Sequence, residues 1–533
     1  MAHDVSPQDP GQRERLPIVR IGVILCLLFG LYVWMNPSFL SRLSTLRSTS
    51  GRVIFLATFL LAWGALLACS VAPRAWAATA LLFFGGNLLI STTYARVMGR
   101  SMSLNDAQNL REAMGSILDA IRQYGRTAGL VTLAIAALAG LLLWGRRSIR
   151  TRTPLPLVAC SLATTLSYGT FLLRGGATSM LYFPANFESG LHALALTLEP
   201  LVRRSSGPEA PLPVEEVPLD PAVRNVVLVI DESIEAHVFH REATDHPIPD
   251  AVDLGIGYSF ENNSAGSNLL LRRAADPRAV ERSIHQFPSV FRLARDHGFR
   301  TAYLDAQGIL SDADVQDYFE AKDKDFIDQL PPLSEYGSRP ERDPNAERLL
   351  LDILGRGQRT FILVNKQGTH FPYAKNLPAE MAGLPDPYRT SVARTSVGFL
   401  ARLAPKLPSG TLLLYTSDHG QNFKGRAPHN NAPGECTVSE WQVPIVVVHS
   451  SDMKPWADRI QRTWHDCADH GALAETLRNL LGARHPGQPS LLTPPTEELT
   501  QRHRAYYGSP KGLFGAPVLS LAIDKRKEAF LRE

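Results

Sequence analysis

The sequence predicts two parts of different fold class: an N-terminal domain of five transmembrane helices and a C-terminal α/β domain with a mostly parallel sheet. Two patterns predict this division. Five long apolar runs precede residue 174, and short β-branched runs alternate with helical patterns after residue 224. A chain of 533 residues also exceeds the ~100–200 residues of a typical single domain. The net charge of +4 is too small to indicate nucleic acid as a partner.

Each of the five apolar runs is close to the ~20 residues that a helix needs to cross a bilayer. The last four contain no charged residue, and five such runs in succession are improbable in a soluble protein. We therefore expect five membrane spans, with the bilayer as a partner of the chain. The runs are Ile21–Met35, which extends back to Pro17, Val53–Val71, Ala75–Ala95, Thr127–Gly145 and Thr153–Leu173.

The arginines of the short loops indicate the orientation, because cytoplasmic loops carry an excess of Lys and Arg. Eight arginines fall on each side, and the densest cluster, from Arg146 to Arg152, favours a cytoplasmic N-terminus. Five spans then place the C-terminal part outside the cytoplasm. Residues 207–221 contain five prolines without a helical or strand period, as linkers do. The predicted organisation is a membrane domain (1–173), a linker (174–224), an α/β domain (225–508) and a solvated tail (509–533).

Continuous apolar strands alternate with helical patterns in the C-terminal part. This alternation is typical of a parallel sheet that is covered by helices on both faces. In such folds, ligands bind outside the carboxyl ends of the strands. The expected strands are NVVLVI (225–230), RTAYLDAQ (300–307), TFILVN (360–365), TLLLYTSDHG (411–420) and VPIVVVH (443–449).

Carboxylates and imidazoles follow three of these strands. The first strand ends in Asp231, Glu232 and Ser233, another runs into Gln367–His370, and a third runs into Ser417–Gly420. Because the carboxyl ends of parallel strands meet at one edge of a sheet, we expect these side chains to converge. Glu, Asp and His are ligands that zinc and manganese accept. The sequence therefore predicts a metal centre at this edge.

These motifs resemble those of the alkaline phosphatase and sulfatase superfamily, and within it the membrane-bound phosphoethanolamine transferases that modify bacterial lipid A and related envelope glycans. In that family, a strand followed by G-E-[ST] supplies a zinc-binding Glu, which Glu232 matches, and S-D-H-G matches Ser417–Gly420. The resemblance spans nearly the whole chain. It implies an alkaline-phosphatase-like domain in which Glu232, Asp418 and His419 bind zinc, with one or two ions and with manganese as an alternative metal.

The resemblance also implies a nucleophilic hydroxyl. The family's S-C-G-T segment supplies a nucleophilic Thr, and its nearest match is Ser264-Ala265-Gly266-Ser267. Ser267 is therefore the expected nucleophile and the fourth metal ligand. Ser233 is the rival nucleophile, because it adjoins the expected metal ligand Glu232.

Two histidines are expected to act beside the metal. A G-S-H segment of the family matches Gly368–His370, and an H-G-x-P segment matches residues 429–433 loosely. The resemblance thus implies that His370 and His429 bind phosphate, transfer protons or hold a second metal. Weaker candidates for lining or supporting the site are Lys366, Asn268, Gln307 and His470.

Besides the Ser that replaces the nucleophilic Thr, three positions depart from the family pattern. Asp231 stands where the family usually has Gly, Glu235 stands where an Arg commonly follows, and Ala265 replaces the Cys. The departures at Asp231 and Glu235 support a separate hypothesis, a non-catalytic membrane protein that keeps the fold as a scaffold. The chain contains no C/S-x-P-x-R segment for formylglycine, which disfavours sulfate ester hydrolysis.

The resemblance implies zinc-dependent transfer of phosphoethanolamine from phosphatidylethanolamine to lipid A or another envelope glycan, through a covalent Ser/Thr-type intermediate. The alternative is a related phosphoglycerol transferase or phosphodiesterase. An enzyme whose donor is a phospholipid must work at the bilayer, in agreement with the predicted spans. The expected location is the bacterial inner membrane, with the catalytic domain in the periplasm. Cys436 and Cys467 could form a disulfide there or stay reduced.

Overall fold

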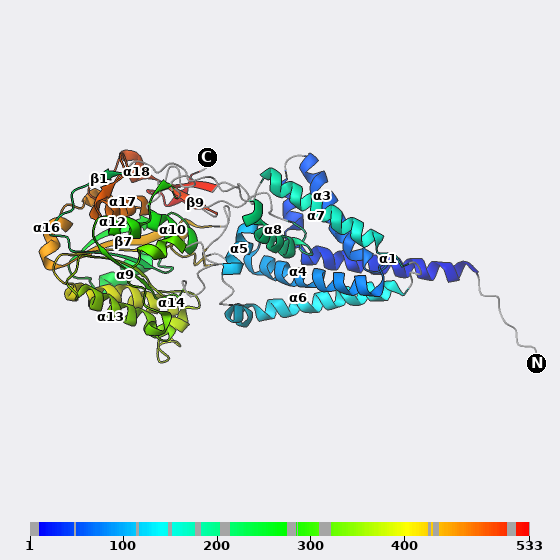
Figure 1. The fold of residues 1–533 in the computed structure, drawn as a ribbon. Coiled ribbons are helices and arrows are strands. Elements are labelled where there is room, and N and C mark those ends of the chain that lie inside the picture. Colours follow the sequence, from blue (N-terminus) through cyan, green and yellow to red (C-terminus); the bar gives the residue numbers. More distant parts are fainter. Residues whose placement is uncertain are drawn as a thin grey trace, which may run out of the picture. The chain divides into compact units, whose positions relative to one another are not determined.

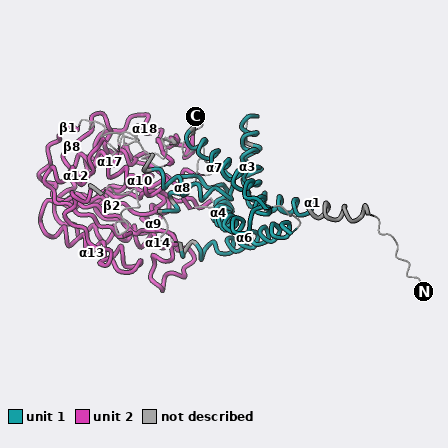
Figure 2. The backbone as a smooth tube through the Cα atoms, turned by 45° about the vertical axis from the view of Figure 1, so that its right-hand side comes forward, with its two compact units in different colours: residues 1–204, 513–516 teal, residues 205–512, 517–533 magenta. Residues whose placement is uncertain are grey.

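The computed structural model of the chain divides into two compact units (Figure 2). One is built mainly from residues 1–204, and the other mainly from residues 205–512 and 517–533. Each unit has a buried apolar core of its own. The structure describes residues 10–46, 49–112, 117–147, 152–175, 183–202, 214–273, 284, 286–308, 321–424, 428–429, 436–508 and 519–531.

The described residues of the first unit form helices and no strands (Figure 1). Four segments are long and apolar enough to cross a membrane: Thr49–Ala68, Arg74–Met98, Ile121–Arg146 and Leu155–Leu173. The first predicted span corresponds to a shorter apolar stretch, Gly22–Met35, at the end of helix α1. The helices are α1 (Pro10–Met35), α2 (Phe39–Thr45), α3 (Thr49–Ala68), α4 (Arg74–Met98), α5 (Leu104–Glu112), α6 (Ile117–Arg146), α7 (Leu155–Gly175) and α8 (Glu188–Val202).

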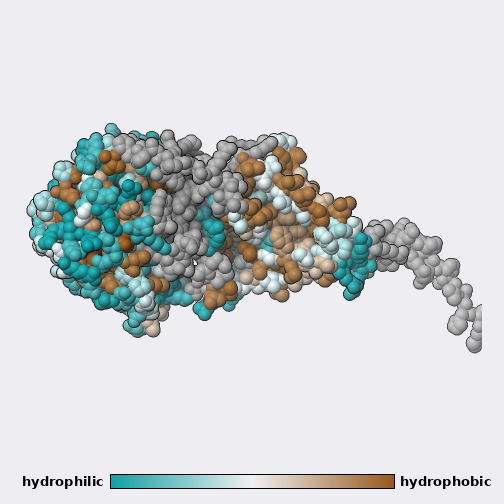
Figure 3. All heavy atoms as spheres, viewed as in Figure 1, coloured by the Kyte–Doolittle hydropathy of each residue, from teal (hydrophilic) through white to brown (hydrophobic). Residues whose placement is uncertain are grey.

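The surface of these helices is apolar. Leu82, Leu133 and Leu173 are among the large hydrophobic side chains exposed there, and Figure 3 shows hydrophobic residues gathered over this unit. An exposed apolar surface of this extent suits lipid, because water would solvate it poorly. The helical form also satisfies the backbone within each segment, as a bilayer requires.

Helix α8 lies inside the predicted linker. Its residues Leu191, Ala195 and Leu196 recur at helical spacing and are buried in the core of the first unit. Burial of one helix face against the membrane helices is what holds a short helix of this kind in place. The first unit therefore extends beyond the boundary predicted at residue 173.

The second unit contains a six-stranded sheet with the strand order β3-β7-β6-β2-β5-β4. Strands β4, β5, β2 and β6 are parallel, whereas β7 runs antiparallel to both of its neighbours. The predicted mostly parallel sheet is confirmed, with β7 as the exception. Because β7 is buried along its whole length, it has the continuous apolar sequence of a parallel strand. The strands are β2 (Asn225–Asp231), β3 (Ala251–Tyr258), β4 (Arg300–Asp305), β5 (Thr360–Asn365), β6 (Thr411–Ser417) and β7 (Gln442–His449).

Helices cover both faces of the sheet, as predicted. Val226, Leu228 and Ile230 of β2 enter one core, with α10, α12, α16 and α17, whereas Val227 and Val229 enter the other, with α9, α13, α14 and α15. Alternation along one strand thus fills both cores. The helices are α9 (Ala236–Asp245), α10 (Ser264–Arg273), α12 (Val290–Asp296), α13 (Arg342–Leu354), α14 (Pro387–Ser391), α15 (Gly398–Leu403), α16 (Lys454–Ala457) and α17 (His470–Leu480).

The predicted tail contains ordered strands. β10 (Leu519–Asp524) pairs with β9 (Arg502–Tyr507) and with β11 (Ala529–Phe530) in a small antiparallel sheet. Lys525, expected to be solvated, is buried instead. Its ammonium donates to the Leu499 carbonyl (2.7 Å) and lies 3.5 Å from Asp469 Oδ2. Asp469 in turn caps helix α17, since it accepts from the Ala472 N–H. The C-terminal residues thus support the start of α17.

Two cysteines of the second unit have no disulfide between them. Neither Cys436 nor Cys467 forms a disulfide, and the buried Cys467 donates its S–H to the Thr463 carbonyl. Of the two alternatives left open by the sequence, the structure therefore has the reduced one.

Lys525→Met should lower the free energy of unfolding of the second unit by about 3 kcal/mol, because it leaves Asp469 buried without its cation. Lys527→Met is the matched control. That side chain is 78% exposed, so its loss should change stability by less than about 0.5 kcal/mol. Urea unfolding of the full chain in detergent, followed by tryptophan fluorescence, measures both effects. Equal effects of the two variants would contradict the assignment.

Candidate active site

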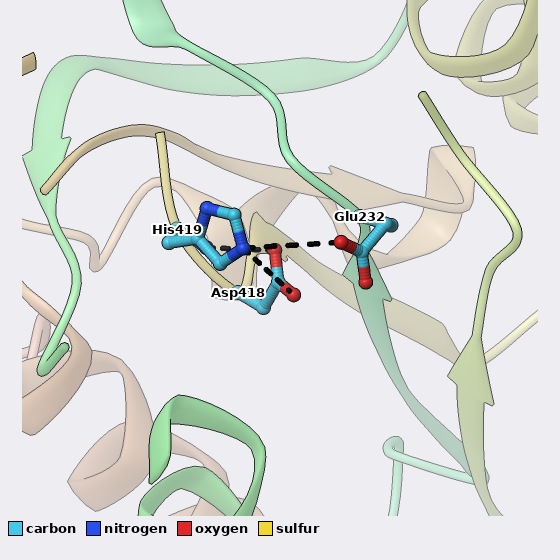
Figure 4. Close-up of side chains that lie close together, drawn as sticks. All are labelled: Glu232, Asp418 and His419. Carbon is cyan, nitrogen blue, oxygen red and sulfur yellow. Dashed lines mark hydrogen bonds and ion pairs between the residues drawn. The ribbon is translucent and has the colours of Figure 1, made fainter. Parts of the chain in front are cut away.

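Three predicted metal ligands meet at the carboxyl edge of the sheet. Glu232 follows β2, and Asp418 and His419 follow the adjacent parallel strand β6, in which Ser417 pairs in register with Asp231. One ligand atom of each residue lies within 4.8 Å of the others, and all three residues are buried. Figure 4 shows the His419 ring turned toward the two carboxylates. The structure thus brings these three predicted residues together.

The imidazole of His419 faces the carboxylates with its Nε2 atom. This nitrogen lies 3.8 Å from Glu232 Oε1 and 3.7 Å from Asp418 Oδ2. His419 Nδ1 lies 2.7 Å from the Gly420 carbonyl, so Nδ1 carries the proton and donates it there. The Nε2 lone pair is then directed at the carboxylates. A hydrogen bond on the outer nitrogen of this kind orients metal-binding histidines.

The cluster has the electrostatics of a cation site. Burial and the neighbouring Glu232 charge raise the pKa of Asp418 to about 7, and burial also raises the pKa of Glu232. Asp418 Oδ2 is buried without a hydrogen-bond partner among the described residues. Two buried carboxylates, one of them with an unsatisfied oxygen, and an imidazole lone pair are a donor set that fits a divalent metal ion.

A serine that the sequence analysis passed over completes this cluster. Ser264 is half-buried, and its Oγ lies 3.2 Å from His419 Nε2, 3.4 Å from Glu232 Oε1 and 3.5 Å from Glu232 Oε2. It is the first residue of helix α10. The positive end of a helix dipole favours a phosphate at such a position.

The predicted nucleophile Ser267 does not reach the cluster. It lies one helical turn further along α10 and is fully buried. Its hydroxyl accepts from the Glu261 N–H and donates to the Glu261 carbonyl, both at 3.2 Å. Both hydrogen bonds of this hydroxyl are made to the backbone of Glu261. The structure therefore does not place the Ser267 hydroxyl at the cluster, and Ser264 is the serine of this segment that lies there.

The rival Ser233 lies at the cluster, where its hydroxyl and its N–H are hydrogen-bonded to two of the expected metal ligands. Its hydroxyl donates to Glu232 Oε1 (2.7 Å) and its N–H donates to Asp418 Oδ1 (2.9 Å). Its φ of +63° lies in the left-handed region that non-glycine residues rarely adopt. Strain of this kind is tolerated where the surroundings fix the backbone, here by orienting two expected metal ligands.

The two predicted histidines also lie near the cluster. The ring centroid of His429 is 4.4 Å from that of His419. Burial and the nearby His419 and His370 lower the pKa of His429 well below its usual value. His370 Nδ1 lies 2.7 Å from the Phe371 carbonyl and 2.9 Å from Arg339 Nη2, and burial together with this guanidinium lowers the pKa of His370 to about 4. Both imidazoles are therefore neutral at pH 7. Residues 430–433 of the same predicted motif lie outside the described residues.

The weaker candidates have different places. Gln307 Nε2 donates to Glu232 Oε2 (2.9 Å), so it does line the site. Asn268 bonds the Ser264 carbonyl (3.1 Å) from one turn along the helix. His470 is buried behind the site, where its Nδ1 accepts from the Phe260 N–H and its Nε2 lies 3.0 Å from the Ser417 carbonyl. These residues support the cluster from its sides.

Both unusual acidic residues have partners within the fold. Glu235 caps helix α9, since its carboxylate accepts from the N–H groups of His237 and Val238. Asp231 forms an ion pair of 2.6 Å with Lys366, and both side chains are fully buried. These departures therefore have structural explanations and no longer support a non-catalytic scaffold.

Gln421 is a further residue that sequence reasoning missed. It is buried, its Oε1 lies 3.3 Å from His429 Nδ1, and its amide donates to the Tyr373 hydroxyl. The available signal was its place directly after the S-D-H-G segment. For Ser264, the signal was its place in the same segment, Ser264–Ser267, that matches the nucleophile segment of the family.

Comparisons with known proteins agree with this architecture. Residues 224–483 match the family model described as Sulfatase. No curated protein sequence is significantly similar to the chain. Among solved structures, the integral membrane protein lipooligosaccharide phosphoethanolamine transferase A (EptA) from Neisseria meningitidis is similar with a TM-score of 0.53 and 14% identity, over 86% of this chain and 95% of that chain.

A second solved structure covers the C-terminal part alone. The C-terminal periplasmic domain of EptC from Escherichia coli, in complex with Zn, has a TM-score of 0.48 and 15% identity over 59% of this chain and 96% of that chain. With the converging strand-end residues and the apolar helices, the family match leads to one assignment. Residues 224–483 form a domain that matches the Sulfatase family model, joined to an N-terminal set of apolar helices in a fold similar to that of EptA.

Proposed function

We propose that the chain is a zinc-dependent transferase that moves phosphoethanolamine from phosphatidylethanolamine to lipid A or another envelope glycan. The observation that carries this proposal is the Ser264 hydroxyl, which adjoins both His419 and Glu232 in the buried cluster. The fold shared with EptA, itself a phosphoethanolamine transferase, supports the choice of transferred group. The apolar helices support a phospholipid donor.

The metal would be held by Glu232, Asp418 and His419. When bound, a zinc ion supplies positive charge that lowers the pKa of a nearby hydroxyl and stabilises charge on phosphoryl oxygens. Borderline ligands such as imidazole and carboxylate suit this ion, with manganese as an alternative. Glu232, Asp418 and His419 would hold one ion. If a second ion binds, His370 and His429 would be its ligands.

The chain's own residues then divide the transfer into two steps. Ser264 Oγ attacks the phosphorus of the donor, and the bond from phosphorus to the diacylglycerol oxygen breaks. An acceptor oxygen next attacks the same phosphorus and releases Ser264. The neutral imidazoles of His370 and His429 are suited to take the hydroxyl proton and to return one to the leaving oxygen.

The proposed location is the bacterial inner membrane, with the second unit in the periplasm. The helices of the first unit support membrane residence, because they expose apolar side chains over lengths that match a bilayer. The arginine cluster from Arg146 to Arg152 supports a cytoplasmic N-terminus. A donor phospholipid in the bilayer would then be available at the membrane surface.

Ser264→Ala should abolish transfer, because among the described residues its hydroxyl is the one that contacts both Glu232 and His419. Ser267→Ala is the matched control on the same helix and should keep most of the activity. Mass spectrometry of envelope lipids and glycans from cells with each variant measures the phosphoethanolamine increment. Intact-mass analysis of the wild-type protein should find the covalent adduct on Ser264. Loss of the increment in Ser267→Ala alone would refute the assignment.

Removal of zinc should destabilise the protein more at pH 8 than at pH 6. The raised pKa of Asp418, about 7, means that this carboxyl is mostly protonated at pH 6 but charged beside Glu232 at pH 8. When the pKa of a carboxyl is higher in the folded than in the unfolded state, folding stability falls as the pH rises from the unfolded value to the folded one, so the metal-free protein loses stability between pH 6 and pH 8. The measurement is the melting temperature with and without chelator at both pH values. Asp418→Asn should remove most of the pH dependence of the metal-free protein, and an equal loss of stability at both pH values would contradict the model of charge repulsion.

A further inference from the structure

A buried ammonium lies next to the proposed metal centre but does not face it. Lys366 follows β5, and its side chain is 0% exposed. The ammonium donates to Asp231 Oδ2 (2.6 Å) and to the Thr395 carbonyl, and it lies 3.6 Å from Asp343 Oδ2. It also lies 4.6 Å from the ring centroid of Phe399. Two hydrogen bonds and one ion pair thus engage the ammonium inside the fold.

The Asp231 carboxylate links this ammonium to a metal ligand. Its Oδ1 accepts from the backbone N–H of Glu232 (2.9 Å), and its Oδ2 accepts from the Tyr415 hydroxyl (2.7 Å) as well as from Lys366. The carboxylate is therefore fixed on both oxygens. Because the N–H of Glu232 is bonded to it, the backbone from which the Glu232 side chain extends is fixed as well.

The Asp343 carboxylate acts in the same way on the loop that carries His370. Its two oxygens accept from the N–H groups of Gln367 (2.9 Å) and Gly368 (3.0 Å). Thr369 then ties this loop to Glu232, since its N–H and its hydroxyl both donate to the Glu232 carbonyl, at 3.1 and 2.9 Å. One lysine thus joins two carboxylates, each of which holds a segment of the site.

Two features of the surrounding backbone accommodate the Asp231 carboxylate and the Lys366 ammonium. A Cβ atom on Gly368 would lie 2.2 Å from Asp231 Oδ1, so the carboxylate occupies space that only glycine leaves open there. Thr395 belongs to a π-helix, Val392–Val397, and its carbonyl accepts from Lys366. Such π-helical turns occur frequently at functional sites. Buried ion pairs contribute little net stability compared with apolar packing, which favours a positioning role for these charges.

We propose that Asp231, Lys366 and Asp343 form an ion triad of positioning residues that sets the affinity of the metal centre. The triad fixes the backbone of Glu232 and the loop that leads to His370. This inference rests on the proposed function, because it concerns the metal ligands of that site. The experiment that tests this inference measures zinc affinity, whereas the proposed function is tested by the transfer of phosphoethanolamine.

Two double variants distinguish the effect of the hydrogen bond to the Glu232 N–H from the effect of the charges of the triad. D231N/K366M and D231A/K366M change the charge of the triad equally, but only the amide side chain of D231N/K366M keeps an oxygen that can accept from the Glu232 N–H. Competition with a chromogenic chelator gives the zinc Kd of the full chain in detergent. We expect D231N/K366M to stay within about threefold of the wild type. D231A/K366M should bind zinc about 10- to 100-fold more weakly, as is typical when the groups that orient metal ligands are removed.

Arg478→Met is the matched control for loss of a buried cation. Arg478 is buried like Lys366, pairs with Glu475 at 2.9 Å and lies 4.3 Å from the ring centroid of Phe287. Its loss should lower the melting temperature and leave the zinc Kd unchanged. A purely structural role of the triad would predict that D231A/K366M behaves like this control.

Equal zinc affinity in D231A/K366M and D231N/K366M would overturn the inference while leaving the proposed function intact. A wild-type chain that binds no divalent metal would instead overturn the proposed function. If the double variants do not fold, Asp343→Asn gives the same readout, since its amide keeps a single oxygen for the N–H groups of Gln367 and Gly368. We expect its zinc Kd to rise about tenfold, and an unchanged Kd would equally overturn the inference.

Discussion

The site depends on one electrostatic constraint, the burial of two carboxylates side by side at the ends of adjacent parallel strands. Glu232 and Asp418 lie where β2 and β6 end in register. Two buried charges of the same sign repel each other and lose their hydration, so one must take a proton or both must share a cation. The His419 lone pair and the Ser264 hydroxyl complete a set of groups around the position that such a cation requires.

The three candidate metal ligands could be predicted from the sequence because their position follows from a rule of topology. A carboxylate directly after a fully buried apolar strand lies at the ligand-binding edge of a parallel sheet. Both Glu232 and the pair Asp418-His419 have that position. The same rule indicated the class of fold, since the parallel strands of the sheet are short apolar runs. It could not indicate the direction of β7, because burial on both faces leaves no mark of direction in the sequence.

The serine that lies at the cluster could not be predicted in the same way. Ser264 and Ser267 are three residues apart, and which one faces the cluster depends on where helix α10 begins. Sequence patterns locate helix ends only to within a few residues. The first residue of the helix faces His419, while the hydroxyl one turn later bonds the Glu261 backbone. Two ion pairs could not be predicted for a different reason. Asp231 pairs with Lys366, which is 135 residues away in the sequence. Lys525 pairs with Asp469, and no sequence motif connects these two residues.

The strand order has a consequence for how the second unit folds after synthesis. Strand β2 lies in the middle of the sheet, yet both of its neighbours come much later in the chain. The bond between Asp231 and Ser417 spans 186 residues. Until β5 and β6 have been made, the apolar faces and both edges of β2 are without partners, a state that promotes aggregation. The first residues of the site to be synthesised are thus among the last to be enclosed.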